Sequence, residues 1–423
     1  MRLAPDIAAR VTADQNLAED FARLCDFGGR LAGTESERQA LDYVRQSAGA
    51  ATGMSVRSLP VAYRGWSARS AKLVLPGGKA HRCHPLVRTI ATPPGGLSAE
   101  VVDLGRGTPE EFEAYAGDIR GRIVLVRHEL MFSAGTIHRR RKYEMARAAG
   151  AVGFLIASPL PSALVSGSSG RDGDAGIPAL GITPETAGLL RRTATGWPRV
   201  EIAIETVEGP AETETLVVEV PGQTDEWVVL SAHVDGHDVN ESAMDNASGV
   251  AAALSALRAV APACGSFRRG IRAMFFSVEE WALTGSAIYV ASLSDAEKSR
   301  IALNVNLDSV AGSANLAALT SGYAEIEPLL LSVADANGHA LQTIRPLLTN
   351  SDHANFAMAG IPAFRLVAGY DDPTANLRLV LTEADTRDKV TITELKQATH
   401  LTAAILAAAC TAEPDAALRW RTR

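Results

Sequence analysis

The second half of the chain alternates short apolar runs with segments of helical periodicity, and this pattern constrains the fold most. From residue 215 onward the apolar runs LVVEVPG, WVVLSAHVD, IRAMFFSVEE, ALNVNLDSVA and IPAFRLVAG are separated by helical segments such as GVAAALSALRAVA and AEIEPLLLSVADANG. Strands that are apolar almost throughout are buried on both faces, which is typical of parallel sheets. We therefore expect an α/β fold with a mixed, largely parallel sheet covered by helices on both faces.

Residues 67–200 have a different character and predict a separate small domain. Short β-like runs (AKLVLP, AEVVDLG, GRIVLVRHE) alternate with turns rich in glycine and proline, and a single clear helix, RRRKYEMARAAG, follows them. We predict three parts: residues 1–66 as the N-terminal part of the main domain, an inserted β-rich domain at 67–200, and the main α/β domain at 201–423. Two helices are expected within 15–52, the second capped by Thr34 or Ser36.

Composition excludes several classes of protein. A net charge of −7 gives no basic surface for nucleic acid, and the four scattered cysteines form no CxxC pair, which argues against a thiolate zinc site or a disulfide framework. No apolar leader and no run of 18 apolar residues occurs. We expect no membrane segment and a cytoplasmic protein, or a secreted one if a leader was removed. The oligomeric state is left open.

Polar residues gather where the predicted strands end. In an isolated SVEEWALTGS, the adjacent Glu279 and Glu280 would simply be solvent-exposed. In open α/β sheets, however, ligands bind beyond the carboxyl ends of the strands. The residues at these ends, with one from the loop that follows the first of them, are His233, Asp235, Asp245, Glu279, Glu280 and Asp308.

Each of these residues has a simpler explanation when it is taken alone. Asp245, for example, could cap the following helix, and His233 could be a packed core histidine. Their convergence on one edge of one sheet instead predicts a metal site, and histidine with carboxylates suits zinc. A cation also explains the adjacent acids, because one can bind metal while its neighbour acts as a general base.

At these positions the chain resembles peptidase family M28, the zinc-dependent aminopeptidases and carboxypeptidases. The matching stretches are HVDGHDVNESAMDNASG, SVEEWALTGS, NVNLDSVAG and SDHANFAMAGIPAF. The resemblance implies the zinc exopeptidase fold and a centre of two zinc ions. It implies that His233 and Asp308 bind one ion, that Glu280 binds the other, and that Asp245 bridges the two.

The same resemblance assigns further roles. Glu279 matches the general base, and Asp235 matches the acid that orients a histidine ligand. Asp352 matches a position close to the substrate and is a candidate supporting residue. Residues 67–200 resemble a protease-associated (PA) domain through GDIRGRIVLVRH, KYEMARAAGAVGFLIA and IPALGIT, which implies no chemistry of its own. Its four histidines are expected at the surface or in packing: His81, His84, His128 and His138.

The chain departs from the family pattern at one zinc ligand. The family usually supplies its last histidine from a motif like H-T-x-x-D-T, and here LVLTEADTRDKV places Leu381 at that position. Three interpretations follow. His353 could replace the missing ligand, His237 could do so with less support, or the second ion is weak or absent. Zn²⁺ is therefore expected in one or two copies.

The resemblance favours an enzyme that cleaves peptides or amino-acid amides, most simply an aminopeptidase. Asp238, Glu241 or the second zinc ion could hold a substrate α-amine. A carboxypeptidase specificity is not excluded by the sequence. Two other classes also stay open: a catalytically weak or inactive binding protein of the same family, and a small-amide hydrolase or glutaminyl-cyclase-like enzyme on the same fold.

Overall fold

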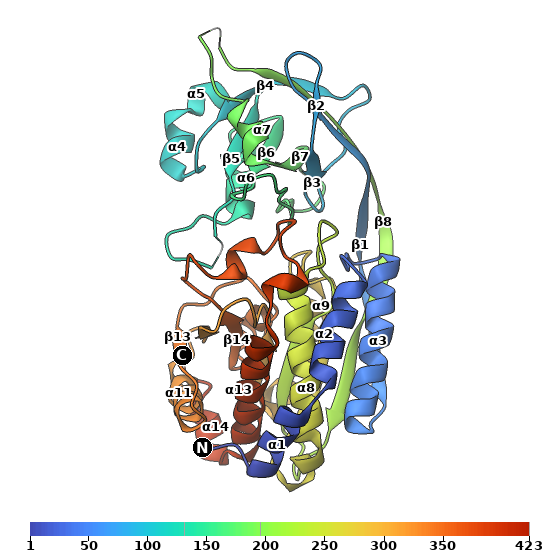
Figure 1. Ribbon diagram of the computed structural model, residues 1–423, viewed down its shortest axis with the longest axis vertical. Coiled ribbons are helices and arrows are strands. Elements are labelled where there is room, and N and C mark those ends of the chain that lie inside the picture. Colours follow the sequence, from blue (N-terminus) through green and yellow to red (C-terminus); the bar gives the residue numbers. More distant parts are fainter. Residues whose placement is uncertain (131, 195, 423) are drawn as a thin grey trace.

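The structure, a computed structural model, describes residues 1–130, 132–194 and 196–422. Figure 1 shows a large α/β domain that contains both chain ends and a smaller β-rich domain above it. Two long strands connect them, β1 (Val56–Val74) and β8 (Arg199–Val220). They pair antiparallel from Val56↔Val218 to Val74↔Glu201. The predicted boundaries at 66/67 and 200/201 fall inside these strands, which run from one domain into the other.

The described strands form one sheet in the order β13-β12-β14-β11-β9-β10-β8-β4-β5-β6-β7-β3, with β1 pairing with β8 and with β2. In the large domain β9 is parallel to β10 and β11, and β11 is parallel to β14. β8 and β12 run antiparallel to their neighbours β10 and β14. The mixed, largely parallel sheet is therefore confirmed. The large-domain strands are β9 (Trp227–His233), β10 (Gly270–Phe276), β11 (Ile301–Leu307), β12 (Leu316–Leu319), β13 (Leu341–Ile344) and β14 (Ala363–Ala368).

Helices bury the central strands on both faces, since every residue of β11 is buried. Helix α8 is the centre of one layer, where α1, α2, α3 and α13 pack against it (Figure 1). The bounds are α1 (Pro5–Ala13), α2 (Asn16–Asp26), α3 (Glu35–Thr52), α8 (Gly249–Val260), α9 (Thr284–Ser292), α10 (Asp295–Arg300), α11 (Glu327–Ala336), α12 (His353–Met358), α13 (Ile392–Thr411) and α14 (Pro414–Arg419). Thr34 caps α3 by accepting a hydrogen bond from the Glu37 N–H, one of the two predicted caps.

The small domain has a parallel core of β4 to β7, flanked by short helices. Its elements are β2 (Ala80–His81), β3 (Cys83–Pro85), β4 (Leu97–Asp103), α4 (Pro109–Ala114), α5 (Ala116–Ile119), β5 (Ile123–Arg127), α6 (Arg139–Ala148), β6 (Gly153–Ala157), β7 (Ala179–Ile182) and α7 (Pro184–Gly188). Its loop 164–166 also contacts the large domain, because the Ser166 N–H donates to the Leu381 carbonyl at 2.7 Å. The small domain is thus attached at a second place besides the β1–β8 pair.

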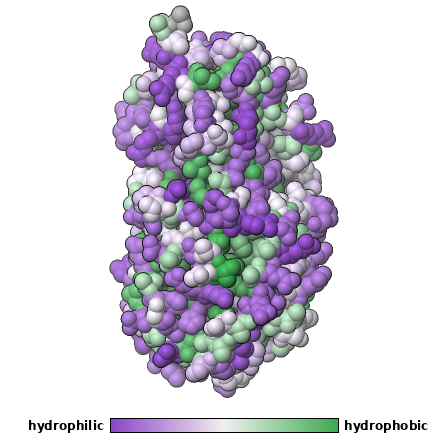
Figure 2. Space-filling model, in the orientation of Figure 1, coloured by the Kyte–Doolittle hydropathy of each residue, from purple (hydrophilic) through white to green (hydrophobic). Residues whose placement is uncertain are grey.

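One helical stretch in the described chain, Ala243–Ser266, is long and apolar enough to cross a membrane. The protein itself buries 78% of its most apolar window, as expected for a core helix. Figure 2 shows hydrophilic residues spread over one face of the molecule, with apolar residues in small patches between them.

Candidate metal centre

The carboxyl ends of three neighbouring strands bring the predicted residues together. His233 is the last residue of β9 and is in register with Phe276, the last residue of β10. Glu279 and Glu280 follow β10 after a two-residue turn, and Asp308 follows directly on β11. Asp245 joins them from the irregular turn Ala243–Ser248 that precedes α8. This confirms the convergence that the strand ends predicted.

His233, Asp245 and Asp308 form a compact group that could hold a metal ion. Each offers one ligand atom, and these atoms lie within 4.8 Å of one another. The Nε2 atom of His233 is 3.1 Å from Oδ1 of Asp245 and 3.6 Å from Oδ1 of Asp308. Arg365 pairs with Asp308 at 3.1 Å and holds its pKa below the usual value although burial acts to raise it. One imidazole and two carboxylates are a donor set that zinc accepts.

Asp235 connects the histidine to the two glutamates. Its carboxylate accepts the backbone N–H of Glu279 on one oxygen and that of Glu280 on the other, both at 3.2 Å. The Nδ1 atom of His233 is 3.0 Å from the Asp235 carbonyl oxygen and 3.6 Å from its carboxylate. Asp235 therefore fixes the orientation of the imidazole and of both acids, a position suited to a residue that supports metal ligands.

Glu280 faces His237 rather than the His233 group. The Nε2 atom of His237 is 2.6 Å from Oε2 of Glu280. The two atoms do not form a hydrogen bond despite this short distance. Both ring nitrogens of His237 are buried without a hydrogen-bond partner among the described residues. The sequence had ranked His237 below His353 as a replacement ligand.

His353 lies at the start of α12 and is fully buried. Among the described residues, no carboxylate forms an ion pair with it, and burial lowers its pKa to about 3, with smaller effects of the charges of Arg365 and Asp308. Its predicted role as a zinc ligand thus gains no geometric support. Its neighbour Asp352 is also buried, and burial raises the pKa of Asp352 to about 7. The role of Asp352 near the substrate stays a prediction.

Leu381 lines the same small cavity as Asp245, Glu280 and Asp308, which agrees with its alignment to the family's histidine position. Its side chain belongs to an apolar cluster that includes Phe132 of the small domain and Met244. The residue is therefore part of the contact between the domains and offers no metal ligand.

The centre carries an excess of buried negative charge. Burial raises the pKa values of Glu279 and Glu280 well above normal, and neighbouring carboxylates raise them further. Burial opposes a charge on His233, but the surrounding acids, above all Glu279, raise its pKa well above the usual value. Such a cluster is costly unless a cation neutralises it. The unpartnered buried atoms of His237 and Glu280 support the same conclusion.

Two supporting residues were missed in the sequence. Asp385 accepts the backbone N–H groups of Met244 at 2.7 Å and Asp245 at 3.3 Å. Arg365 is the partner of Asp308. A signal existed for both: Asp385 is the acid of the TEADT stretch, and Arg365 is a lone charge inside the apolar run IPAFRLVAG.

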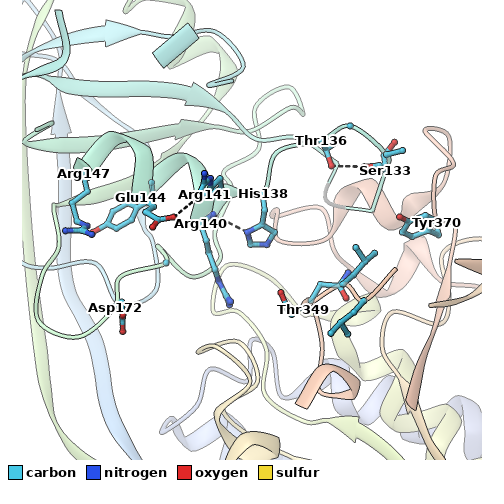
Figure 3. Close-up of a pocket in the computed structure, with 17 residues that line it drawn as sticks. Ser133, Thr136, His138, Arg140, Arg141, Glu144, Arg147, Asp172, Thr349 and Tyr370 are labelled. Carbon is cyan, nitrogen blue, oxygen red and sulfur yellow. Dashed lines mark hydrogen bonds and ion pairs between the residues drawn. The ribbon is translucent and has the colours of Figure 1, made fainter. Parts of the chain in front are cut away.

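A wide pocket leads to the centre between the two domains. It has a volume of about 670 Å³ and is lined by residues of α6 and the preceding loop and by residues 347–350 and Tyr370 of the large domain (Figure 3). The inner cavity at the metal centre measures only about 50 Å³. Four residues line both spaces: His138, Arg140, Thr349 and Asn350. The centre is thus reached through a cleft that narrows strongly toward the acids.

The other histidines of the small domain have varied positions. His128 is buried, and burial lowers its pKa to about 3. His138 caps α6 by accepting the Arg140 N–H, and it points toward the pocket in Figure 3. His84 approaches Asp238 of the large domain at 3.0 Å. His81 is partly exposed.

Both parts of the chain are similar to known proteins. Residues 215–406 match the model of peptidase family M28, and residues 72–190 match the PA domain. A probable lipoprotein aminopeptidase, LpqL of Mycobacterium tuberculosis, is 26% identical over 85% of this chain and 74% of its own length. The match with carboxypeptidase Q of Xenopus laevis has 27% identity and covers 67% of this chain and 63% of that protein. The structure of a zinc aminopeptidase from Bacillus subtilis matches with a TM-score of 0.73 at 22% identity, covering 96% of this chain and 95% of the other.

Proposed function

We propose that the protein is a zinc-dependent aminopeptidase, a metallopeptidase that acts on peptides, because residues 215–406 match the model of peptidase family M28. The observation that carries this proposal is the group of His233, Asp245 and Asp308, whose ligand atoms lie within 4.8 Å of one another. The buried Glu279 lies beside this group and is not part of it. The proposal assigns these three residues to one zinc ion, with Glu280 at a second position.

The donor chemistry supports zinc. The atoms are imidazole nitrogens and carboxylate oxygens, and no cysteine takes part. A zinc ion bound there would polarise the scissile carbonyl and lower the pKa of a water molecule. Asp235 would hold His233 and the backbone of Glu279 in place during the reaction, because it already contacts both.

Glu279 is the proposed general base. It lines the inner cavity beside Asp245 and Asp308 and is not part of the three-residue group. In the proposed reaction its carboxylate takes a proton from the attacking water and then gives it to the leaving amine. The neighbouring Glu280 cannot exchange roles with it easily, because its carboxylate is directed at His237.

The shape of the site favours removal of a terminal residue. An inner cavity of about 50 Å³ behind a cleft of about 670 Å³ accepts the end of a peptide more readily than its middle. The negative charge around that cavity suits a protonated α-amine. Asp238 and Glu241, nominated from sequence for this purpose, are engaged elsewhere: Asp238 contacts His84 and Glu241 pairs with Arg387. We assign amine recognition to the acids of the centre itself.

Arg140 is proposed to bind the far end of short substrates. It lines both the wide cleft and the inner cavity, and its Nε atom is buried without a hydrogen-bond partner among the described residues. A guanidinium at this place suits a peptide carbonyl or a terminal carboxylate. The proposed substrates are therefore short peptides with a free amino end.

The predicted cytoplasmic location stays a prediction, since the mycobacterial relative is named a lipoprotein. Retention of Glu279 and of the histidine and acids around it argues against an inactive binding protein, because buried charges of this kind are costly to keep without a use.

The test uses aminoacyl anilides with a free α-amine and their N-acetylated counterparts. We expect zinc-loaded protein to cleave the free-amine compounds, a chelator to stop the reaction, and added zinc to restore it. The matched control is Glu279→Gln, which should bind zinc and cleave neither set. Cleavage of N-acetylated peptides from the carboxyl end would instead identify a carboxypeptidase, and a zinc-loaded protein that cleaves nothing would contradict the proposal.

A further inference from the structure

We propose that His237 supplies the imidazole that Leu381 does not, and that His237, Glu280 and Asp245 together form the second zinc site of this protein. The proposal rests on the proposed function, because it adds an ion to the same centre. It assigns a ligand at a position outside the motif from which the family usually takes its histidine.

The first argument is the contact between His237 and Glu280. Their side chains are 2% and 9% exposed, and the Nε2 and Oε2 atoms are 2.6 Å apart. Neither ring nitrogen of His237 nor the Oε1 atom of Glu280 has a hydrogen-bond partner among the described residues. Buried polar atoms are rarely left unpaired. Two ligand atoms on one tetrahedral zinc ion are about 3.3 Å apart, so the Nε2 and Oε2 atoms would have to move apart by about 0.7 Å to bind the ion together.

The second argument is the position of Asp245. Among charged groups, Asp245 has the largest effect on the pKa of both His237 and Glu280. The same carboxylate is 3.1 Å from Nε2 of His233. Asp245 therefore contacts His233 directly and acts through its charge on His237 and Glu280, as expected of a carboxylate that bridges two ions.

The third argument is that hydrogen bonds from Arg30 fix the loop that carries His237. Arg30 is fully buried, and its guanidinium donates to the carbonyl oxygens of Val234, Glu241 and Ser242, each at 2.9 Å. These carbonyls flank the loop on both sides of His237. Fixed ligands bind metal more tightly because less conformational entropy is lost on binding.

The backbone of His237 is fixed as well. Its N–H donates to the Ser242 hydroxyl at 2.9 Å. Gly29 packs so closely that an added Cβ would lie 2.2 Å from the His237 carbonyl oxygen. A glycine is required at position 29 for the loop to approach this far. Two segments distant in sequence thus hold the backbone of His237 in place.

Position 381 takes part in the contact between the two domains. The Leu381 carbonyl accepts the Ser166 N–H, and its side chain packs with Phe132 and Met244. The segment serves the attachment of the small domain in this protein. His353, the other candidate ligand, has no ion pair with Glu280 in the described chain, so His237 is the histidine that the geometry favours.

The test measures zinc per chain by mass spectrometry after reconstitution, with Co²⁺ absorption as a second readout of coordination. We expect about two ions for the parent protein and about one for His237→Gln, a change that keeps a side chain of similar size. The control His353→Gln should keep two, and Leu381→His should add none. Circular dichroism and thermal melting verify that each variant is folded.

The inference is overturned if His237→Gln keeps the metal content of the parent protein, or if Leu381→His raises the content from one ion to two. These results are separable from a failure of the proposed function. A protein with two ions that cleaves no aminoacyl anilide would contradict the function and leave the metal assignment intact. A protein that cleaves aminoacyl anilides but whose metal content does not depend on His237 would contradict the metal assignment and leave the proposed function intact.

Discussion

Replacing Asp235 with asparagine changes one atom and should disturb two proposed zinc ligands, His233 and Glu280, together with the proposed general base Glu279. The two carboxylate oxygens accept the N–H groups of Glu279 and Glu280 at 3.2 Å each, and the carboxylate is 3.6 Å from Nδ1 of His233. An asparagine amide has a single acceptor oxygen. In either orientation of the amide, its NH₂ group faces one of the two backbone N–H groups.

The size of the effect follows from these contacts. One buried N–H loses its acceptor, which costs about 1–3 kcal/mol in the free energy of unfolding of the metal-free protein. The residues that Asp235 orients are also less well positioned for zinc. Loss of such a supporting residue lowers metal affinity by about 10- to 100-fold, which corresponds to about 1.4–2.8 kcal/mol of binding free energy.

Two assays separate these effects. Denaturant unfolding of the chelated protein measures stability, and competition with a chromophoric chelator measures zinc affinity. Asp238→Asn is the matched control, since it removes a carboxylate of the same segment whose contact is the partly exposed His84. We expect the control to change both quantities little. If Asp235→Asn unfolds and binds zinc as the parent protein does, the support attributed to Asp235 is refuted.

Three further predictions concern catalysis, pH and substrate choice. Glu279→Gln should lower kcat by about 10²- to 10⁴-fold with unchanged metal content, because a general base is lost; a near-normal rate would contradict its role. Burial raises the pKa of Asp352 and of Asp385 to about 7, so the folded metal-free protein binds more protons than the unfolded chain, and its melting temperature should fall as pH rises from about 4 to about 7. A melting temperature that rises over this range would speak against it. Arg140→Gln should raise KM for dipeptides more than for aminoacyl anilides, and equal KM changes would argue against carboxylate binding.

The positions of the ligand-bearing strand ends could be predicted because the rule behind them is topological. Parallel strands end at the same edge, so His233 and Asp308 had to be neighbours once β9 and β11 were recognised as strands. Both strands are seven residues long and mostly apolar, which made them visible in the sequence. The geometry of the three-residue group then depended mainly on this shared edge.

The direction of the His237 side chain could not be predicted in the same way. It depends on a loop held by Arg30, whose partner Val234 is 204 positions away in the sequence. Neither periodicity nor motif spacing contains this information. The sequence therefore favoured His353, which lies in a motif that the family places near the site, over the histidine that approaches Glu280.

Short elements were missed for a different reason. Strands β12 and β13 have four residues each, LAAL and LQTI, and α12 has six. Such lengths contain too few positions to distinguish an alternating pattern from a helical one. The two strands extend the sheet beyond β14 and do not change the edge at which the metal centre lies.

The β1–β8 pair has a mechanical consequence for the cleft. In this ribbon Gly65 is opposite Gly209 and Arg64 is opposite Pro210, so its middle has little side-chain support and one N–H fewer to pair. The Ser166–Leu381 hydrogen bond attaches the small domain to the large domain at a second place. Bending of this ribbon near Gly65 would move the small domain and change the width of the cleft, unless the contact with the loop that carries Leu381 holds the domain in place.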